Sequence, residues 1–112
     1  MNKGRVYHIV EIPVWEKALM EMRYVPESLT KEGFIHCSTE EQLMETAETW
    51  YKSESRLMVL EIIVKRVKDK LKWEISRNGE LFPHLYSRIP WEAIETTRTI
   101  EQQEDGSFAW EA

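Results

Sequence analysis

The sequence predicts an α+β fold, with a mixed or mostly antiparallel twisted sheet and two main helices in one domain spanning residues 1–112. Apolar residues recur at helical spacing in 13–22 and in 39–51, which indicates two amphipathic helices. Residues 57–64 are apolar on both faces, which is typical of a strand in the middle of a sheet. A chain of 112 residues is long enough for one hydrophobic core and too short for two.

The N-terminal part begins with an expected strand at residues 6–10, where apolar residues occupy both faces. Pro13 suits the first turn of the helix that follows. Residues 23–32 read as a connector, because Pro26 breaks the helical pattern. Within this connector we expect residues 28–30 to be extended.

A short central stretch, residues 33–38, joins a strand to the second helix. Alternation in a strand places Phe34, His36 and Ser38 on one face and Ile35 and Cys37 on the other. We therefore expect His36 and Ser38 to be neighbouring polar side chains that are both buried.

The second helix has an expected start signal. Ser38, with Glu41 three residues later, fits a capping box at the N-terminus of the helix at 39–51. A strand that ends on a helix N-terminus can hold an anion or a sugar-phosphate, although such junctions occur in every α/β protein.

Within the strand at 57–64, Glu61 interrupts one apolar face. It either lies at a sheet edge or solvated end, which we favour, or is a buried partner for a histidine. The basic residues of 65–72 are expected to form a solvated turn, with phosphate contact as the minority interpretation.

The C-terminal part contains further short strands. Pro83 places the segment 81–86 at a sheet edge or beside a bulge. The remaining expected elements are a strand at 71–75, a tight turn at 78–79, a helical turn at 90–94, a strand at 96–101, and a hairpin turn at 105–106 leading into 107–110.

Composition excludes several functional classes. The formal net charge of −5 argues against general binding to nucleic acid. No apolar run is long enough to span a membrane. A single cysteine allows no internal disulfide, so a reducing cytoplasm is the expected location. Glycine-rich phosphate loops, dinucleotide fingerprints, HExxH, CxxC and GxSxG motifs are absent from the sequence.

The three histidines are the main chemical signal. His8, His36 and His84 each lie in a strand-like segment with apolar or aromatic neighbours. They are either three separate hydrogen-bonded core residues or three groups that converge on one pocket, and we favour one pocket by a modest margin. In an extended segment Tyr86 shares a face with His84.

Metal binding ranks third among the interpretations. Three imidazoles can hold zinc, but metal ligands usually include one close spacing and these histidines are far apart in the sequence. We therefore expect no bound metal and no tightly bound cofactor. Cys37 points away from His36 in a strand, so it is expected to be a small core residue rather than a nucleophile.

Several motifs lie along most of the chain. They are Tyr7-His8, Gly33-Phe34-Ile35-His36-Cys37-Ser38 with the following Thr39-Glu40-Glu41-Gln42, Lys72-Trp73-Glu74, Phe82-Pro83-His84-Leu85-Tyr86, and Pro90. Together they resemble a small bacterial family of unknown function, DUF952, and the resemblance covers the chain up to about residue 100. The resemblance implies a fold like that of ADP-ribosyltransferases, a split α+β barrel that cradles NAD. Ser87 stands where the family usually has glycine.

The transferase resemblance implies roles for particular residues. The motif Tyr7-His8 matches the first-strand histidine that holds a ribose, and His36 and Ser38 match the second motif. The sequence departs at the third motif, where a glutamate is expected and Glu74 is the nearest acid.

Two functions follow from these roles. The first is an enzyme acting on NAD or a nucleotide-like substrate. Its catalytic residues would be His36, His84 and Glu74, and its substrate-binding residues would be Tyr7, His8, Ser38 and Tyr86. The alternative is a module that binds such a small ligand without breaking a bond. The sequence does not indicate the oligomeric state.

Overall fold

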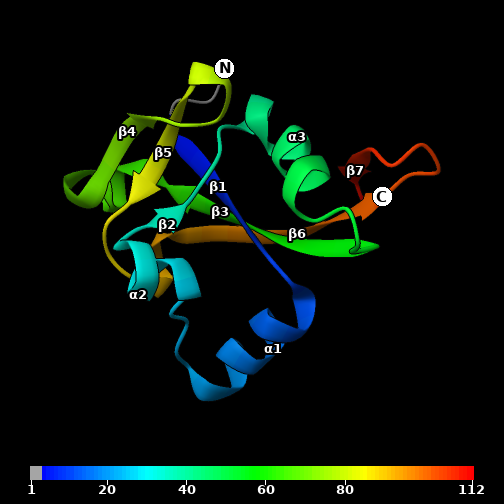
Figure 1. Cartoon of the computed structure of the whole chain (residues 1–112). Helices are drawn as coiled ribbons and strands as arrows, with labels where there is room; N and C mark the ends of the chain where they lie inside the picture. The colour runs from blue at the N-terminus through cyan, green and yellow to red at the C-terminus, as the bar shows by residue number, and fades with distance from the viewer. Residues whose placement is uncertain (1–3) are drawn as a thin grey trace.

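A computed structural model gives the structure of residues 4–112, so residues 1–3 of the expected domain lie outside the described residues (Figure 1). In chain order the elements are β1 Arg5–Val10, α1 Ile12–Glu21, α2 Glu27–Glu32, β2 Ile35–His36, α3 Glu40–Trp50, β3 Arg56–Ile63, β4 Leu71–Ile75, β5 Leu81–Leu85, β6 Ile94–Gln102 and β7 Phe108–Trp110. Short 3₁₀ turns lie between β3 and β4, between β4 and β5, and before β6. The predicted α+β class is confirmed.

The strands form two sheets rather than one. The larger sheet has the order β1-β3-β6-β7, the smaller has the order β2-β5-β4, and every pairing is antiparallel. A single bridge between Tyr7 and Ser38 connects β1 with the segment after β2. The backbone N–H of each of these residues donates to the carbonyl of the other, at 2.8 and 2.7 Å. The two sheets are thereby held side by side at this point.

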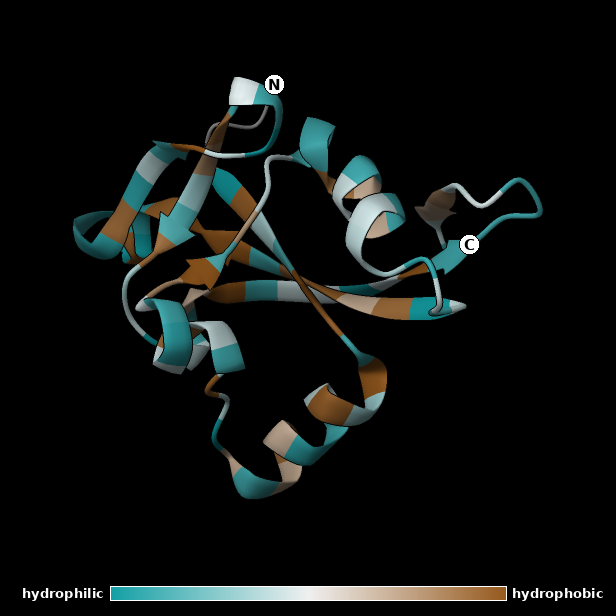
Figure 2. Ribbon diagram, in the orientation of Figure 1, coloured by the Kyte–Doolittle hydropathy of each residue, from teal (hydrophilic) through white to brown (hydrophobic). Residues whose placement is uncertain are grey.

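The strand β3 lies between β1 and β6 and carries the core, as its two-sided apolarity predicts. Leu57, Val59, Leu60 and Ile62 are all buried. Leu60 and Ile62 pack with residues of α1 and the smaller sheet, whereas Leu57 and Val59 pack with residues of α3 on the opposite face. Figure 2 shows hydrophobic residues following β1 and β3 through the middle of the molecule. Burial on both faces of β3 contributes to the apolar driving force for folding.

The two predicted helices are present with slightly different ends. In α1, Pro13 occupies the first turn, and buried Trp15 and Ala18 face the core. The capping box of α3 is one residue later than predicted. Thr39 accepts from the backbone of Gln42, and the Gln42 side chain accepts from the backbone of Thr39. Ser38 cannot take this role, because its hydroxyl is bonded to Thr46.

The prediction that residues 28–30 are extended is wrong, because they lie in α2. Pro26 precedes the helix, and the chain leaves it at Gly33, whose φ of 90° favours glycine. Lys31 forms an ion pair with Glu27 one turn earlier, at 2.9 Å. A proline therefore starts a new helix here instead of ending all helical structure.

The prediction that Pro83 lies at a sheet edge or bulge is also wrong, because β5 is the inner strand of the smaller sheet. The Pro83 carbonyl accepts from the backbone of Cys37, at 3.1 Å. In an antiparallel strand the nitrogen and oxygen of one residue point to the same side. The nitrogen that lacks a hydrogen therefore faces the chain just beyond the two-residue β2, and the pairing with β4 is intact.

Neither interpretation of Glu61 describes its position. It lies inside β3 and is half-buried. Tyr7 donates to its carboxylate at 3.2 Å and Thr96 donates at 2.7 Å. Hydroxyl donors, rather than a histidine or bulk water alone, therefore satisfy this charge.

The Thr39 cap can be tested by mutation. We expect Thr39→Ala to lower the free energy of unfolding by about 1 kcal/mol, because the backbone N–H of Gln42 loses the hydroxyl that accepts its hydrogen bond. Urea denaturation measures this change. Thr49→Ala, in the last turn of the same helix, is the matched control and should cost less. Equal losses in the two variants would contradict the assignment of Thr39 as the cap.

Candidate functional site

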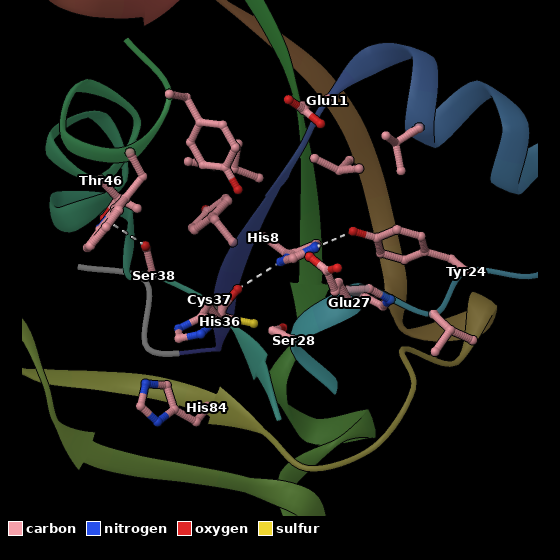
Figure 3. Close-up of a pocket in the computed structure, with 18 of the residues that line it drawn as sticks. His8, Glu11, Tyr24, Glu27, Ser28, His36, Cys37, Ser38, Thr46 and His84 are labelled. Carbon is pink, nitrogen blue, oxygen red and sulfur yellow. Dashed lines mark hydrogen bonds between the residues drawn. The ribbon is translucent and has the colours of Figure 1, made fainter. Parts of the chain in front are cut away.

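A cleft of about 1110 Å³ lies where the two sheets meet, and His8, His36 and His84 all line it. Its walls come from β1, α1, α2, the β2 segment, α3, and the β4–β5 hairpin. Figure 3 shows His36 and His84 near each other, with His8 between His36 and Tyr24. The structure therefore brings together three histidines that are distant in the sequence.

His84 belongs to a hydrogen-bonded group with Glu74 and Tyr86. Its Nδ1 lies 2.7 Å from Glu74 Oε1, and the Tyr86 hydroxyl donates to the same oxygen at 2.7 Å. The antiparallel register explains this arrangement, because Lys72 faces His84 across β4 and β5, and Glu74 is two residues further along. The hydrogen bonds from Tyr86 and then from His84 lower the pKa of Glu74 below its usual value. The same contact with Glu74 raises the pKa of Tyr86.

The Glu74 carboxylate determines the tautomer of His84. An ionised carboxylate only accepts, so the Nδ1 of His84 carries the hydrogen. Nε2 has no hydrogen-bond partner among the described residues, yet no buried polar side-chain atom in residues 4–112 lacks one. Nε2 is therefore not fully buried, and its lone pair is available to accept a proton.

Phe34 joins His36 and His84 into one aromatic cluster. Its ring stacks on His84 at 4.1 Å between centroids and meets His36 at 4.8 Å. The two imidazoles are 5.5 Å apart, because His36 and His84 are partners across β2 and β5. Ile35 and Cys37 point to the opposite face and are buried. The predicted face alternation is therefore present from Phe34 to Cys37.

The expected pairing of His36 with Ser38 is not present. His36 is half-exposed, and its Nε2 lies 3.0 Å from Oε1 of Glu32, the last residue of α2. Ser38 is buried and bonds to Thr46 at 3.1 Å. The chain leaves the extended conformation after β2, so face alternation no longer predicts neighbours there.

His8 has both ring nitrogens occupied within the protein. Nδ1 donates to the His36 carbonyl at 2.7 Å, which can only accept. Nε2 therefore accepts from the Tyr24 hydroxyl, also at 2.7 Å. Burial, the largest cause, lowers the pKa of His8 from 6.5 to about 4. His8 is a neutral wall of the cleft, and in this arrangement neither ring nitrogen is free to hold a ribose hydroxyl.

Tyr7 and Cys37 also line the cleft but are tied to the protein interior. Tyr7 donates to Glu61, and burial raises its pKa to about 12. Cys37 is buried, and burial raises the pKa of its thiol to about 12. A thiol that stays protonated is a poor nucleophile. This agrees with the interpretation of Cys37 as a core residue.

The sequence reasoning missed three residues of the site. Tyr24 holds His8, Thr46 holds Ser38, and Arg77 donates to Thr46 at 3.2 Å. The first two carry no local signal, because their partners are distant in the sequence. Arg77 stands directly before the Asn78-Gly79 turn, which was the one available hint of its position. Lys65 to Lys72 contribute no residue to the cleft lining.

Within residues 4–112, no group of three or more His, Cys, Asp or Glu side chains is arranged to hold a metal ion. In the same range, no helix combines the length and apolarity needed to cross a bilayer.

The neutral state of His8 should appear in the pH dependence of stability. Between pH 6.5 and about 4 the unfolded chain binds a proton at residue 8 and the folded chain does not, so acid destabilises the fold. The loss from His8 alone is about 2 kcal/mol between pH 7 and pH 5. Urea denaturation at several pH values measures it.

The control is His8→Gln, an amide that can donate and accept but does not titrate. The difference between wild type and this variant cancels the other histidines and the carboxylates. The pH-dependent difference should be present between pH 7 and 5. If the two proteins lose stability in parallel over this range, the buried neutral His8 is contradicted.

Comparison with known proteins gives the family. The model described as "Protein of unknown function (DUF952)" matches residues 9–97. The crystal structure of protein CC0527 from Caulobacter crescentus is 30% identical in sequence, with a TM-score of 0.84 over 94% of this chain and 93% of that chain. The solution NMR structure of CC0527 has a TM-score of 0.79 over 93% and 90% of the two chains. No curated protein matches the sequence. The family model spans most of the chain, and the chain therefore belongs to the DUF952 family.

Proposed function

We propose that this protein is an enzyme that binds NAD or a similar nucleotide in the cleft and uses His84 as its proton acceptor. The observation that carries the proposal is the hydrogen bond from His84 Nδ1 to Glu74, which leaves Nε2 as a base at the cleft wall. A neutral imidazole is well matched to proton transfer near pH 7. His84 would take the proton of the attacking nucleophile as the bond from the ribose to its leaving group breaks.

Glu74 would act through His84. Its carboxylate selects the tautomer of the imidazole and would stabilise the imidazolium formed when Nε2 accepts a proton. Tyr86 donates to the same carboxylate oxygen and so holds it in place. His36, half-exposed and 5.5 Å from His84, would contact the substrate at the cleft mouth.

The size and position of the cleft support a nucleotide-like ligand. Its volume of about 1110 Å³ is at the upper end of small-molecule sites, which suits a long ligand such as a dinucleotide. It lies where two sheets meet, as expected for a split barrel like that of ADP-ribosyltransferases. NAD would be the substrate rather than a tightly bound cofactor, and the single buried cysteine suits a reducing cytoplasm.

A non-catalytic binding module is the second candidate, and one observation favours it. Glu74 is not among the residues that line the cleft, so the position of the expected transferase glutamate is not filled by a carboxylate facing the ligand. The cleft would then recognise the ligand through His36 and His84 without breaking a bond.

Ligand binding tests both candidates. We expect NAD or ADP-ribose to raise the melting temperature of the wild-type protein, because the ligand binds only the folded state. His36→Ala and His84→Ala should each weaken binding by about tenfold or more while leaving the circular dichroism spectrum unchanged. Lys68→Ala, exposed and away from the cleft, is the control. Wild-type protein that responds to neither ligand would contradict the proposal.

Replacing Glu74 separates an enzyme from a binding module. We expect Glu74→Gln to bind NAD with nearly unchanged affinity but to release nicotinamide roughly 100-fold more slowly, because the amide cannot stabilise an imidazolium. Calorimetry and chromatography of the products measure the two quantities. Glu80→Gln, on the same hairpin, is the control. If wild type binds NAD and releases no nicotinamide, the enzyme proposal fails and the binding module is supported.

A further inference from the structure

We propose that Arg77 forms a subsite for a phosphate group in the cleft, beside His84. This deepens the proposed function by naming the charged part of its ligand, and it rests on that function only in placing the phosphate on a nucleotide. The observation that carries it is a guanidinium that lines the cleft and is held from one side.

Arg77 is rigidly placed by the hairpin between β4 and β5. It begins a tight turn in which Asn78 and Gly79 both have positive φ, 59° and 75°. The guanidinium carbon lies 4.9 Å from the centroid of the Phe82 ring, and the side chain is only 17% exposed. Packing against an aromatic face restricts a long side chain and so reduces the entropy lost when it binds a ligand.

The Thr46 hydroxyl accepts a hydrogen bond from the Arg77 guanidinium. Thr46 gives its single hydroxyl hydrogen to the Gln42 carbonyl at 3.0 Å, so it accepts from both Arg77 and Ser38. The contact with Thr46 therefore uses one N–H of the guanidinium. A guanidinium has five N–H donors, and within residues 4–112 this is its only side-chain or backbone hydrogen bond. The other donors remain available to a ligand.

The charge of Arg77 is only weakly compensated. The nearest carboxylate is Glu45, at 3.7 Å and 58% exposed, so it is a loose and solvated partner. Arg56 shows the contrast, because it makes two hydrogen bonds of 2.7 Å with Glu111. Arg77 thus keeps its fork free for an anion, and a planar fork suits phosphate oxygens.

The cleft is electrostatically uneven. Near α1 and the start of α2 the cleft is lined by three carboxylates and two cations: Glu11, Glu21 and Glu27 against Lys17 and Arg23. Glu32 also lines the cleft, but it contacts His36, at 3.0 Å. Arg77 is at the hairpin end, with His36 and His84. An anionic group is therefore favoured at the hairpin end and disfavoured at the other.

The neighbours of Arg77 are close in sequence to His84, the proposed base, and to His36. Phe82, under the guanidinium, is two residues from His84 on the same face of β5. Ser38, bonded to Thr46, is two residues after His36. A phosphate held by Arg77 would bring the attached sugar toward the two histidines.

Matched ligands test the subsite. Calorimetry should show AMP binding roughly tenfold or more tightly than adenosine, because the two differ only in the phosphate. Arg77→Gln should remove this difference and leave the adenosine affinity unchanged, and Arg77→Lys should keep part of it. Glu45→Gln should increase the preference for AMP, since it removes a competing carboxylate. A preference for AMP that survives Arg77→Gln, or equal binding of AMP and adenosine by the wild type, overturns the proposal.

A second measurement is independent of nucleotide binding. Titration with inorganic diphosphate at constant ionic strength, followed by the ¹⁵N–¹H signal of the Arg77 Nε–H, should give a saturable shift. Acetate at equal ionic strength should give a much smaller one. If nucleosides fail to bind but diphosphate shifts this signal, the nucleotide function fails and the subsite stands. An unshifted signal, or equal shifts with acetate, overturns the phosphate subsite.

Discussion

The join between β1 and the segment after β2 is the constraint on which the rest of the structure depends. Two backbone hydrogen bonds link Tyr7 with Ser38, and His8 donates to the carbonyl of His36. These contacts hold the larger sheet beside the smaller one and leave the cleft where they meet. They also fix the position of β2, which is only two residues long and pairs with a single further strand. Together with the packing of Ile35 and Cys37 in the same core as Val6 and Val10, this join sets the position of His36 relative to β1.

The buried imidazole of His8 shows how stability and function are divided among the three histidines. A ring with both nitrogens hydrogen-bonded is a structural link between Tyr24, β1 and the β2 segment. Burial keeps it neutral, so it adds no charge to the cleft wall. His84 is also buried, but its Nδ1 is bonded to a carboxylate and its Nε2 has no hydrogen-bond partner within residues 4–112. The same residue type is therefore a structural link in one strand and, as we propose, a proton acceptor in another.

The chemistry that this cleft can support depends on its charged side chains and not on the fold alone. A fold shared with CC0527 of Caulobacter crescentus says how the chain is arranged and does not specify a reaction. Chemistry depends instead on which charges face the cleft. Glu74 reaches it only through His84, whereas Arg77 faces it directly. A cation on one side of the imidazole and a carboxylate behind it would bind an anion and move a proton at neighbouring points.

The sequence by itself determined the elements whose signal is local. Helical spacing predicts α1 and α3, two-sided apolarity predicts β3, and alternation places Phe34 with His36 on one face. Tertiary structure alone decided the division into two sheets, the inner position of Pro83, and the entry of Tyr24 and Arg77 into the cleft. Periodicity reports which face of an element is apolar, because neighbouring residues share one backbone geometry. Pairings such as Tyr7 with Ser38 close long loops, and no residue pattern within a single segment specifies its distant partner.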